Sequence, residues 1–149
     1  VSFPEMRTKA RRLKQSNDLR LIIIDYVQLM SSGKKVESRQ QEVSEFSRAL
    51  KLLAKELEVP VIAISQLNRG SEQRTDKRPQ MSDLRESGSI EQDADMVILL
   101  HREEAYERES PRAGEADLIV AKHRNGPTDT IVLAFQGHYS RFTNMAPSF

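Results

Sequence analysis

A single aspartate ends a run of four apolar residues near the start of this sequence. Residues Leu21–Ile24 are all apolar, Asp25 follows them, and the apolar pattern then stops. A run of this kind predicts a buried parallel strand that delivers a carboxylate to the carboxyl edge of a sheet. Open α/β sheets bind ligands at that edge, and a carboxylate there suits Mg²⁺ on a nucleotide phosphate. The alternative is a structural aspartate that caps the following turn.

A glutamine follows the second apolar run, Val61–Ile64. If the two runs form neighbouring parallel strands, Asp25 and Gln66 lie side by side at one sheet edge. The amide of Gln66 both donates and accepts hydrogen bonds, so it can report whether a γ-phosphate is present. It would pass that signal to the polar loop Asn68–Met81, which would become more or less ordered with the nucleotide state. The alternative is a glutamine that only caps the next turn.

Two cations flank His123 at the tip of a predicted hairpin, which the Asn125-Gly126 pair indicates. Side chains alternate along a strand, so Lys122 and Arg124 are expected to project to the same side. Two cations held together suit a phosphate, including one bound by a neighbouring subunit. The alternative is a solvated hairpin tip.

The elements that must position these residues alternate between helix and strand. Helices are expected from Ser2 to about Lys14 and from Gln40 to Leu57, where apolar residues recur at steps of three and four. The expected strands are Leu19–Asp25, Val61–Ile64, Met96–Leu100, Asp117–Lys122 and Thr130–Phe135. Apolar strands joined by a crossover helix and followed by a hairpin predict an α/β fold. Its sheet is expected to be mainly parallel, flanked by helices, with an antiparallel hairpin at the edge.

Composition narrows the class of protein. The 149 residues suit one domain with a real core, and the chain is 38% hydrophobic and 30% charged, as is typical of soluble proteins. No apolar run approaches the roughly 20 residues of a membrane span, and no signal-peptide pattern is present. The absence of cysteine excludes disulfides and thiolate metal sites and fits a reducing cytosol. The net charge of +1 gives no whole-chain argument for nucleic acid.

Four segments together resemble the DnaB-type family of bacterial replicative DNA helicases. They are Asp25–Met30, Val61–Arg69, Asp83–Asp95 and Lys122–Pro127, and their order and spacing match from roughly Met6 to Ala146. The Asp83–Asp95 segment is too long and too specific for a chance match. The resemblance implies a RecA-like ATPase domain that uses ATP and Mg²⁺ and works as a homo-hexameric ring on single-stranded DNA.

The resemblance also implies a role for each candidate residue. Asp25 matches the Walker B carboxylate, which organises Mg²⁺ through its water. Gln66 matches the sensor that links nucleotide state to the DNA loops. Arg124 matches the arginine finger that completes the neighbour's ATP site, with Lys122 beside it on the γ-phosphate.

The DNA-binding residues implied by the resemblance lie in the Asp83–Asp95 segment. Arg85, Glu86 and Gly88 match the pore loop that grips the DNA phosphate backbone. Arg85 would supply positive charge, and Gly88 with nearby N–H groups would approach a phosphate closely. Glu86 cannot neutralise a phosphate, so we expect it to act through its backbone N–H or through the shape of the loop. A grip on the backbone alone suits a translocating motor, because base readout would stall it.

The resemblance extends to partners and location. It implies primase and a helicase loader as partners, through regions partly outside this chain, and the replication fork in the bacterial cytoplasm as its place of action. It implies no membrane.

One family feature is missing from the sequence. Nothing of the form G-x-x-x-x-G-K-[ST], the Walker A loop, occurs here, and the only Gly-Lys pair, Gly33-Lys34, follows Asp25. The catalytic glutamate of the family also belongs upstream. We therefore expect residues 1–149 to be the C-terminal portion of the motor domain, from Walker B to the arginine-finger hairpin. Alone, the chain is expected to bind ATP poorly, to hydrolyse none and to fold marginally, with an uncovered sheet edge.

Two other functions stay open at this point. The first is a DNA-binding or interaction module without ATP chemistry, which the absence of a Walker A loop favours for this polypeptide as it stands. Another RecA-like ATPase, such as a recombinase or a clock ATPase, would share the Walker B strand and the glutamine after β-strand Val61–Ile64. The Asp83–Asp95 segment argues against that second alternative, because we would not expect it there.

Overall fold

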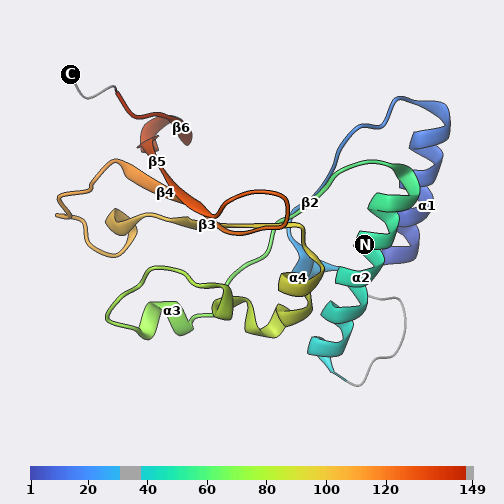
Figure 1. The fold of residues 1–149 in the computed structure, drawn as a ribbon, viewed down its shortest axis with the longest axis horizontal. Helices are drawn as coiled ribbons and strands as arrows, with labels where there is room; N and C mark the ends of the chain where they lie inside the picture. Colours follow the sequence, from blue (N-terminus) through green and yellow to red (C-terminus); the bar gives the residue numbers. More distant parts are fainter. Residues whose placement is uncertain (31–37, 147–149) are drawn as a thin grey trace. The chain divides into compact units, whose positions relative to one another are not determined.

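The computed structural model describes residues 1–30 and 38–146, apart from the side chains of residues 85–88 (Figure 1). The chain divides into two compact units. The first consists of Val1–Asn68 and Leu84–Ala94, and the second of Arg69–Asp83 and Asp95–Phe149.

Two long helices dominate the first unit. Helix α1 spans Phe3–Ser16 and α2 spans Arg39–Leu57, close to the expected bounds. The α1 N-terminus is capped because the Ser2 N–H donates to the Glu5 carboxylate at 2.9 Å, and in α2 the Ser38 hydroxyl accepts from the Gln41 N–H at 3.2 Å. No helix among the described residues is long and apolar enough to cross a membrane.

The core of the first unit lies between these helices, which run side by side in Figure 1. One face of α2 carries the buried side chains that the helical spacing predicts; they are Val43, Phe46, Leu50, Leu53 and Leu57. Ala10 of α1 packs in a cluster with Leu53, Leu57 and Val59. Outside this cluster, Glu56 of α2 accepts from Arg11 of α1 at 2.6 Å.

A short parallel sheet completes the first unit. Strand β1 (Ile22–Ile24) pairs with β2 (Val61–Ala63), with Ile24 opposite Ala63. Helix α2 is the crossover between them. Short helical turns follow: η1 (Val27–Leu29) after β1, and α4 (Gly88–Asp93) after η2 (Met81–Ser87).

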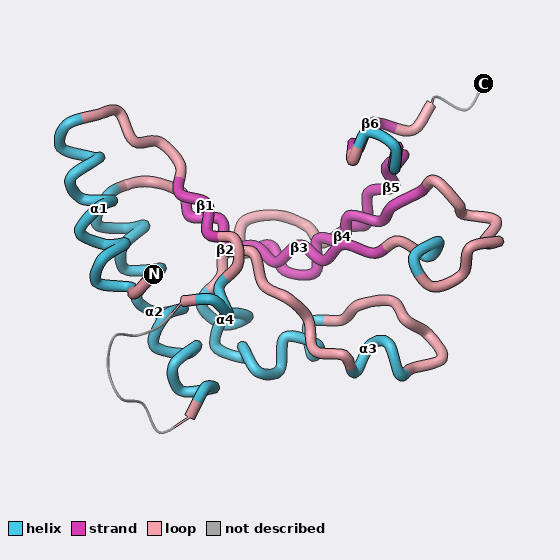
Figure 2. The backbone as a smooth tube through the Cα atoms, turned by 180° about the vertical axis from the view of Figure 1, so that it is seen from behind, coloured by secondary structure: helices cyan, strands magenta, loops and turns pink. Residues whose placement is uncertain are grey.

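The second unit is built on a four-stranded antiparallel sheet, drawn in magenta in Figure 2. Its strands are β3 (Met96–His101), β4 (Glu115–His123), β5 (Asp129–Gln136) and β6 (Arg141–Asn144), and they neighbour one another in chain order. The connections of this unit carry α3 (Gly70–Gln73), η3 (Glu103–Ala105) and η4 (Gly137–Tyr139).

The α/β fold class is confirmed, but the strands pair differently from one continuous, mainly parallel sheet. Among the described strands only β1 and β2 are parallel. Strand β3, expected as a third parallel strand, is antiparallel to β4 along its whole length, from Met96 to His101. The physical reason is the connection: residues 102–114 return the chain directly, which favours an antiparallel neighbour over a crossover. The antiparallel part is therefore larger than a hairpin at the edge.

Candidate functional site

Asp25 and Gln66 follow neighbouring strands of the first unit. Because β1 and β2 are parallel and in register, both chain segments leave the sheet at the same edge. Pairing continues past the strands, since the Ile64 N–H donates to the Ile24 carbonyl at 2.9 Å. The side chains of Asp25 and Gln66 are both exposed. The two segments thus meet at one sheet edge, as the sequence predicts, while the roles of the two side chains stay predictions.

The Asp25 carboxylate is available to a ligand. It has no hydrogen-bond or ion-pair partner among the residues that the structure describes. The peptide bond between Asp25 and Tyr26 is cis. No group of three or more His, Cys, Asp or Glu side chains in residues 1–30 and 38–146 could hold a metal ion. A lone carboxylate fits Mg²⁺, which keeps several waters and takes other oxygens from a nucleotide, better than it fits a metal held by protein alone.

Gln28 links the two segments, and sequence reasoning missed it. Its side-chain Nε2 donates to the Gln66 carbonyl and to the Ser65 hydroxyl, both at 3.0 Å, and its Oε1 accepts from the Gln66 N–H at 3.3 Å. Gln28 therefore contacts both polar backbone groups of Gln66. The available signal was a polar residue in the turn directly after Asp25, within a segment that is otherwise apolar.

Arg39, the first residue of α2, holds the other side of this turn. Its guanidinium donates to the Gln28 carbonyl and to the Met30 carbonyl, the latter at 3.2 Å. It also pairs with Glu42 at 2.5 Å. The start of α2 is thereby tied to the segment that follows Asp25.

Lys122 and Arg124 lie near one end of β4 in the second unit. Lys122 is inside the strand, opposite Val97, and Arg124 is in the turn beyond it. The β3–β4 register shifts between Val97 and Ile98, so Ala121 is the extra residue of a bulge. Strict alternation does not extend through this turn, and the shared direction of the two cations stays a prediction.

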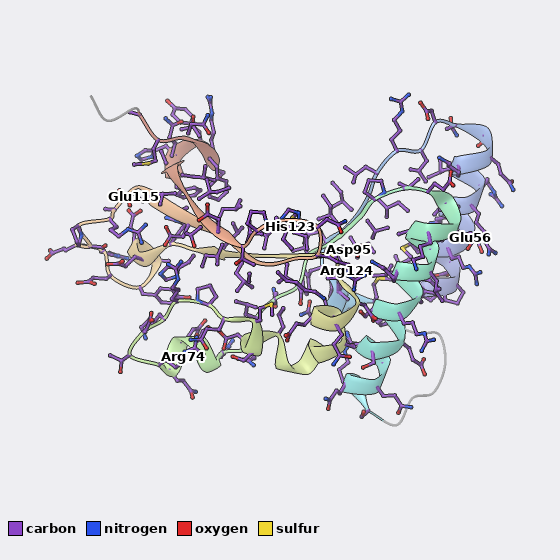
Figure 3. The ribbon with its side chains drawn as sticks, in the orientation of Figure 1. Glu56, Arg74, Asp95, Glu115, His123 and Arg124 are labelled. Atoms are coloured by element: carbon purple, nitrogen blue, oxygen red, sulfur yellow. The ribbon has the colours of Figure 1, made fainter. Side chains whose placement is uncertain are left out.

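Arg124 pairs with Asp95, which immediately precedes β3. The guanidinium Nη1 lies 3.1 Å from the Asp95 Oδ1, and the Arg124 N–H donates to the Asp95 carbonyl at 2.8 Å. Figure 3 shows the two labelled side chains next to each other. Their side chains are 52% and 60% exposed, and exposed pairs of this kind are weak. Sequence reasoning missed Asp95, although it is the last residue of the Asp83–Asp95 segment.

The turn after Arg124 needs a glycine. A Cβ on Gly126 would lie 2.4 Å from the His123 ring. That ring is fixed in turn, because its Nδ1 lies 3.2 Å from the Pro127 carbonyl. The Asn-Gly pair does mark a turn here. Gly126 is not at positive φ, however, so it serves close packing instead of a left-handed backbone.

The predicted DNA-binding residues are described by their backbone alone. Arg85 and Glu86 lie in η2, and Gly88 begins α4. Their side chains, like the Gly33-Lys34 pair, lie outside what the structure describes. Their roles stay predictions.

Helix α4, which follows these residues, is fastened to α2 within the first unit. The buried Ser47 hydroxyl donates to the Asp93 carboxylate at 2.7 Å and lies 3.1 Å from the Ser89 carbonyl. The segment that carries the predicted DNA-binding residues therefore has a fixed attachment at its C-terminal side.

The expected polar loop Asn68–Met81 has more internal structure than its composition suggests. It contains α3, and Arg74 makes two hydrogen bonds to the buried Asp83, at 2.7 and 2.9 Å. Asp83 also accepts from the Gln80 N–H at 2.8 Å. The hydrogen bonds from Arg74, more than any other cause, hold the pKa of the Asp83 carboxyl below its ordinary value.

Asp117 of β4 fixes this loop to the antiparallel sheet. Its carboxylate is 2% exposed and accepts from Arg112 at 2.6 and 2.9 Å and from Arg78 at 3.1 Å. Arg78 also donates to the Thr130 hydroxyl of β5 at 3.1 Å. The hydrogen bonds from Arg112 are the main reason that the pKa of Asp117 lies below its ordinary value.

Comparison with known proteins gives a consistent result. Residues 1–144 match the family model of the DnaB-like helicase C-terminal domain. The chain is 78% identical over 147 residues to the replicative DNA helicase DnaB of Leifsonia xyli, covering 99% of this chain and 32% of that protein. It is 56% identical over 150 residues to the replicative DNA helicase DnaC of Bacillus subtilis, covering 100% of this chain and 33% of the relative.

Solved structures agree with these relatives. An ATPase domain superposes with a TM-score of 0.92 at 46% identity, over 97% of this chain and 52% of the solved one. A structure of a DnaB-like replicative helicase and its interactions with primase also has a TM-score of 0.92 at 46% identity, over 97% and 36% of the two chains. The chain thus spans about a third of the length of the curated relatives named above.

Proposed function

The chain belongs to the family of DnaB-like helicase C-terminal domains, and from that premise we propose that it is part of a ring-shaped, ATP-dependent replicative DNA helicase. Residues 1–149 would form the C-terminal portion of its RecA-like motor domain, from the Walker B strand to the arginine-finger hairpin. The complete protein would translocate on single-stranded DNA and unwind duplex DNA at the replication fork.

The observation that carries this proposal is the shared sheet edge of Asp25 and Gln66. In an open α/β sheet the carboxyl edge of parallel strands is where a nucleotide binds. Asp25 has exposed oxygens without a partner in the described part of the chain, and Gln66 follows the adjacent strand. One residue would thus face the metal and the other would face the phosphate.

We assign Asp25 to Mg²⁺, which it would hold through a bound water. The ion, when bound, neutralises charge on the ATP phosphates. Gln66 would contact the γ-phosphate through its amide and pass the nucleotide state to the loop that follows it. This chain contains no Walker A sequence, so the phosphate cradle must come from outside these residues.

Arg124 and Lys122 would act on the ATP bound by the neighbouring subunit. An arginine supplied in trans stabilises the charge that develops on the transferred phosphate. The exposed pair with Asp95 would keep the Arg124 guanidinium near the hairpin tip until a phosphate replaces the carboxylate. A head-to-tail ring of identical subunits, here a homo-hexamer, gives every site such a neighbour.

Arg85, Glu86 and Gly88 would contact the DNA backbone. Their segment precedes the Ser47–Asp93 attachment, which would fix it relative to α2. Contacts limited to phosphate and sugar leave the motor indifferent to sequence.

Primase and a helicase loader are proposed as partners, through regions partly outside this chain. Primase has support from the solved helicase structure that includes its interactions with primase. The bacterial cytoplasm, at the nucleoid, is the proposed location, because the relatives named above are bacterial replicative helicases.

The test uses a full-length helicase in which this chain replaces the segment that it matches in the Leifsonia xyli relative, hereafter the chimeric helicase. We expect it to hydrolyse ATP faster with single-stranded DNA than without it, whereas the isolated chain should show no turnover. DNA binding without hydrolysis would favour the alternative of a DNA-binding module. A chimeric helicase that neither hydrolyses ATP nor binds DNA would contradict the proposal.

Asp25→Asn is the first variant to make in the chimeric helicase. Loss of the carboxylate should lower Mg²⁺-dependent hydrolysis by about 100-fold or more, because the ion loses its protein anchor. Ring assembly, measured by light scattering, should be unchanged. Asp18→Asn is the matched control, since Asp18 is an exposed aspartate that pairs with the nearby exposed Arg20. A turnover above half the parent value in Asp25→Asn would remove Asp25 from the metal site.

A further inference from the structure

The Gln28 side chain occupies both backbone hydrogen-bonding groups of Gln66 at once. Its Nε2 donates to the Gln66 carbonyl at 3.0 Å while its Oε1 accepts from the Gln66 N–H at 3.3 Å. A side-chain amide supplies a donor and an acceptor from one planar, uncharged group. Gln28 is therefore suited to hold Gln66, in the segment that follows β2, in a fixed orientation.

Gln28 is itself held firmly. It lies in η1, whose first residue Val27 is 1% exposed and donates its N–H to the Ile64 carbonyl at 2.8 Å. The Gln28 carbonyl accepts from Arg39 at the start of α2. The turn that follows Asp25 is thus fixed to β2 on one side and to α2 on the other.

We propose that Gln28 is a positioning residue that fixes the backbone of Gln66 relative to the segment carrying Asp25. A shift of either segment would then move the other, so the sensor amide and the metal-binding carboxylate keep one geometry. This inference rests on the proposed function, because it assigns Gln28 a role in presenting Gln66 to the nucleotide.

The sheet does not need Gln28 to stay together. Three backbone hydrogen bonds already join the strands around it: Ile22 N–H to the Pro60 carbonyl at 3.1 Å, Ile64 N–H to Ile24 at 2.9 Å and Val27 N–H to Ile64 at 2.8 Å. Removing the Gln28 amide leaves these bonds intact and frees only the residues beyond them, Ser65 and Gln66. A defect in Gln28 variants should therefore appear in the sensor and not in the fold.

The test compares Gln28→Glu and Gln28→Ala with the parent chimeric helicase. The carboxylate of Gln28→Glu is close to isosteric but cannot donate to the Gln66 carbonyl. We expect kcat for DNA-stimulated ATP hydrolysis to fall about threefold to tenfold, because a displaced Gln66 would lose about one hydrogen bond to the transition state. The KM for ATP should change less than about twofold, because ground-state binding is not the target. Gln40→Glu, on the exposed first turn of α2, is the matched control and should match the parent.

A double-mutant cycle with Gln66→Ala separates positioning from a general structural effect. If Gln28 acts through Gln66, Gln28→Glu should lower kcat no further once the Gln66 side chain is absent. Equal loss from Gln28→Glu in both backgrounds would overturn the proposal, and so would a Gln28→Glu variant with the parent kcat.

Hydrogen–deuterium exchange gives a readout that needs no activity. The peptide that spans Ile64–Asn68 should exchange faster in Gln28→Ala than in the parent, with α2 unchanged. Unchanged exchange there would also overturn the proposal. If Gln28→Ala shows the expected faster exchange but the parent chimeric helicase does not hydrolyse ATP, the proposed function is contradicted and the role of Gln28 in positioning Gln66 is not. The two failures are therefore distinct.

Discussion

Asp25 and Arg124, the two charged groups proposed to act on the nucleotide, differ in what holds them. Asp25 follows a paired strand, and its oxygens have no partner in the described part of the chain. Arg124 lies in a turn and pairs with Asp95 at 3.1 Å. An exposed pair is worth about 0–1 kcal/mol, less than charge-assisted bonds to a phosphate. Under the proposed function, the phosphate of a nucleotide on the neighbouring subunit would therefore displace Asp95 from Arg124.

Arg85 is expected to bind DNA through charge alone. Arg85→Ala in the chimeric helicase should weaken single-stranded DNA binding and reduce the slope of log affinity against log salt by about 1, because about one fewer counterion is released. Fluorescence anisotropy over a salt series measures both quantities. Arg20→Ala, which removes an exposed arginine from the Asp18 pair, is the control and should leave the slope unchanged. An Arg85→Ala variant with parental affinity would exclude Arg85 from the DNA grip.

At the residue scale, sequence predicts the groups that end strands and misses those that act through the backbone. Asp25 and Gln66 could be found because each ends an apolar run, and parallel strands bring their ends together. Gln28 and Asp95 were missed because each contacts backbone groups of a residue distant in the sequence, Gln66 and Arg124. Such contacts depend on the path of the chain between the two residues, which the types of those two residues do not encode.

Arginine–carboxylate pairs hold the segment Arg69–Asp83 together and attach it to the antiparallel sheet of the second unit. Asp83 holds Arg74 inside the loop, and Asp117 on β4 receives Arg78 from it. Both carboxylates are buried, so each needs its partner to offset the loss of hydration. The segment is therefore attached directly to β4, the strand that also contains Lys122.

The ion pairs of Asp117 make the free energy of unfolding of the second unit depend on pH in the acid range. The folded-state pKa of Asp117 is below its unfolded value of about 3.9. Its stabilisation is therefore complete above about pH 5 and is lost progressively as the pH falls below the unfolded pKa and through the folded pKa. Asp117→Asn should cost about 2–3 kcal/mol at pH 7, since two guanidinium groups lose a buried carboxylate.

Urea unfolding of the chimeric helicase and of Asp117→Asn, followed from pH 7 downward, measures this difference. The gap between the two should be constant down to about pH 5 and should close as Asp117 is protonated below its unfolded pKa. Asp18→Asn serves again as the exposed control. A gap that widens in acid would have the wrong sign for a lowered carboxyl pKa.

At the element scale, helices were more predictable than strand pairing. The apolar spacing of α2 and the Ser2–Glu5 start of α1 are local signals, and both helices form near the expected residues. Each of the five expected strands also forms near its expected position, whereas β6 (Arg141–Asn144) was not expected. The partner of β3, in contrast, is set by the length and course of residues 102–114, and a run of apolar residues such as Met96–Leu100 fits either a parallel or an antiparallel neighbour.

The proposed functional residues of the whole molecule are divided between its two units. Asp25 and Gln66 belong to the first, and Lys122 and Arg124 belong to the second. A site shared across a subunit boundary does not require the two groups of one chain to meet, because each unit can face a different neighbour in a ring. Under the proposed function, one chain therefore contributes residues to two ATP sites, its own and that of a neighbour.

The most direct test mixes two inactive chimeric helicases, one with Arg124→Ala and one with its Walker A lysine, supplied by the Leifsonia xyli portion, replaced by alanine. Each variant retains the half-site that the other lacks. With random assembly of equal amounts, about a quarter of the subunit boundaries would have both halves intact. We predict that steady-state ATP hydrolysis by the mixture exceeds the sum of the two variants alone. A mixture no more active than that sum, with subunit exchange verified, would contradict the role of Arg124 in its neighbour's site.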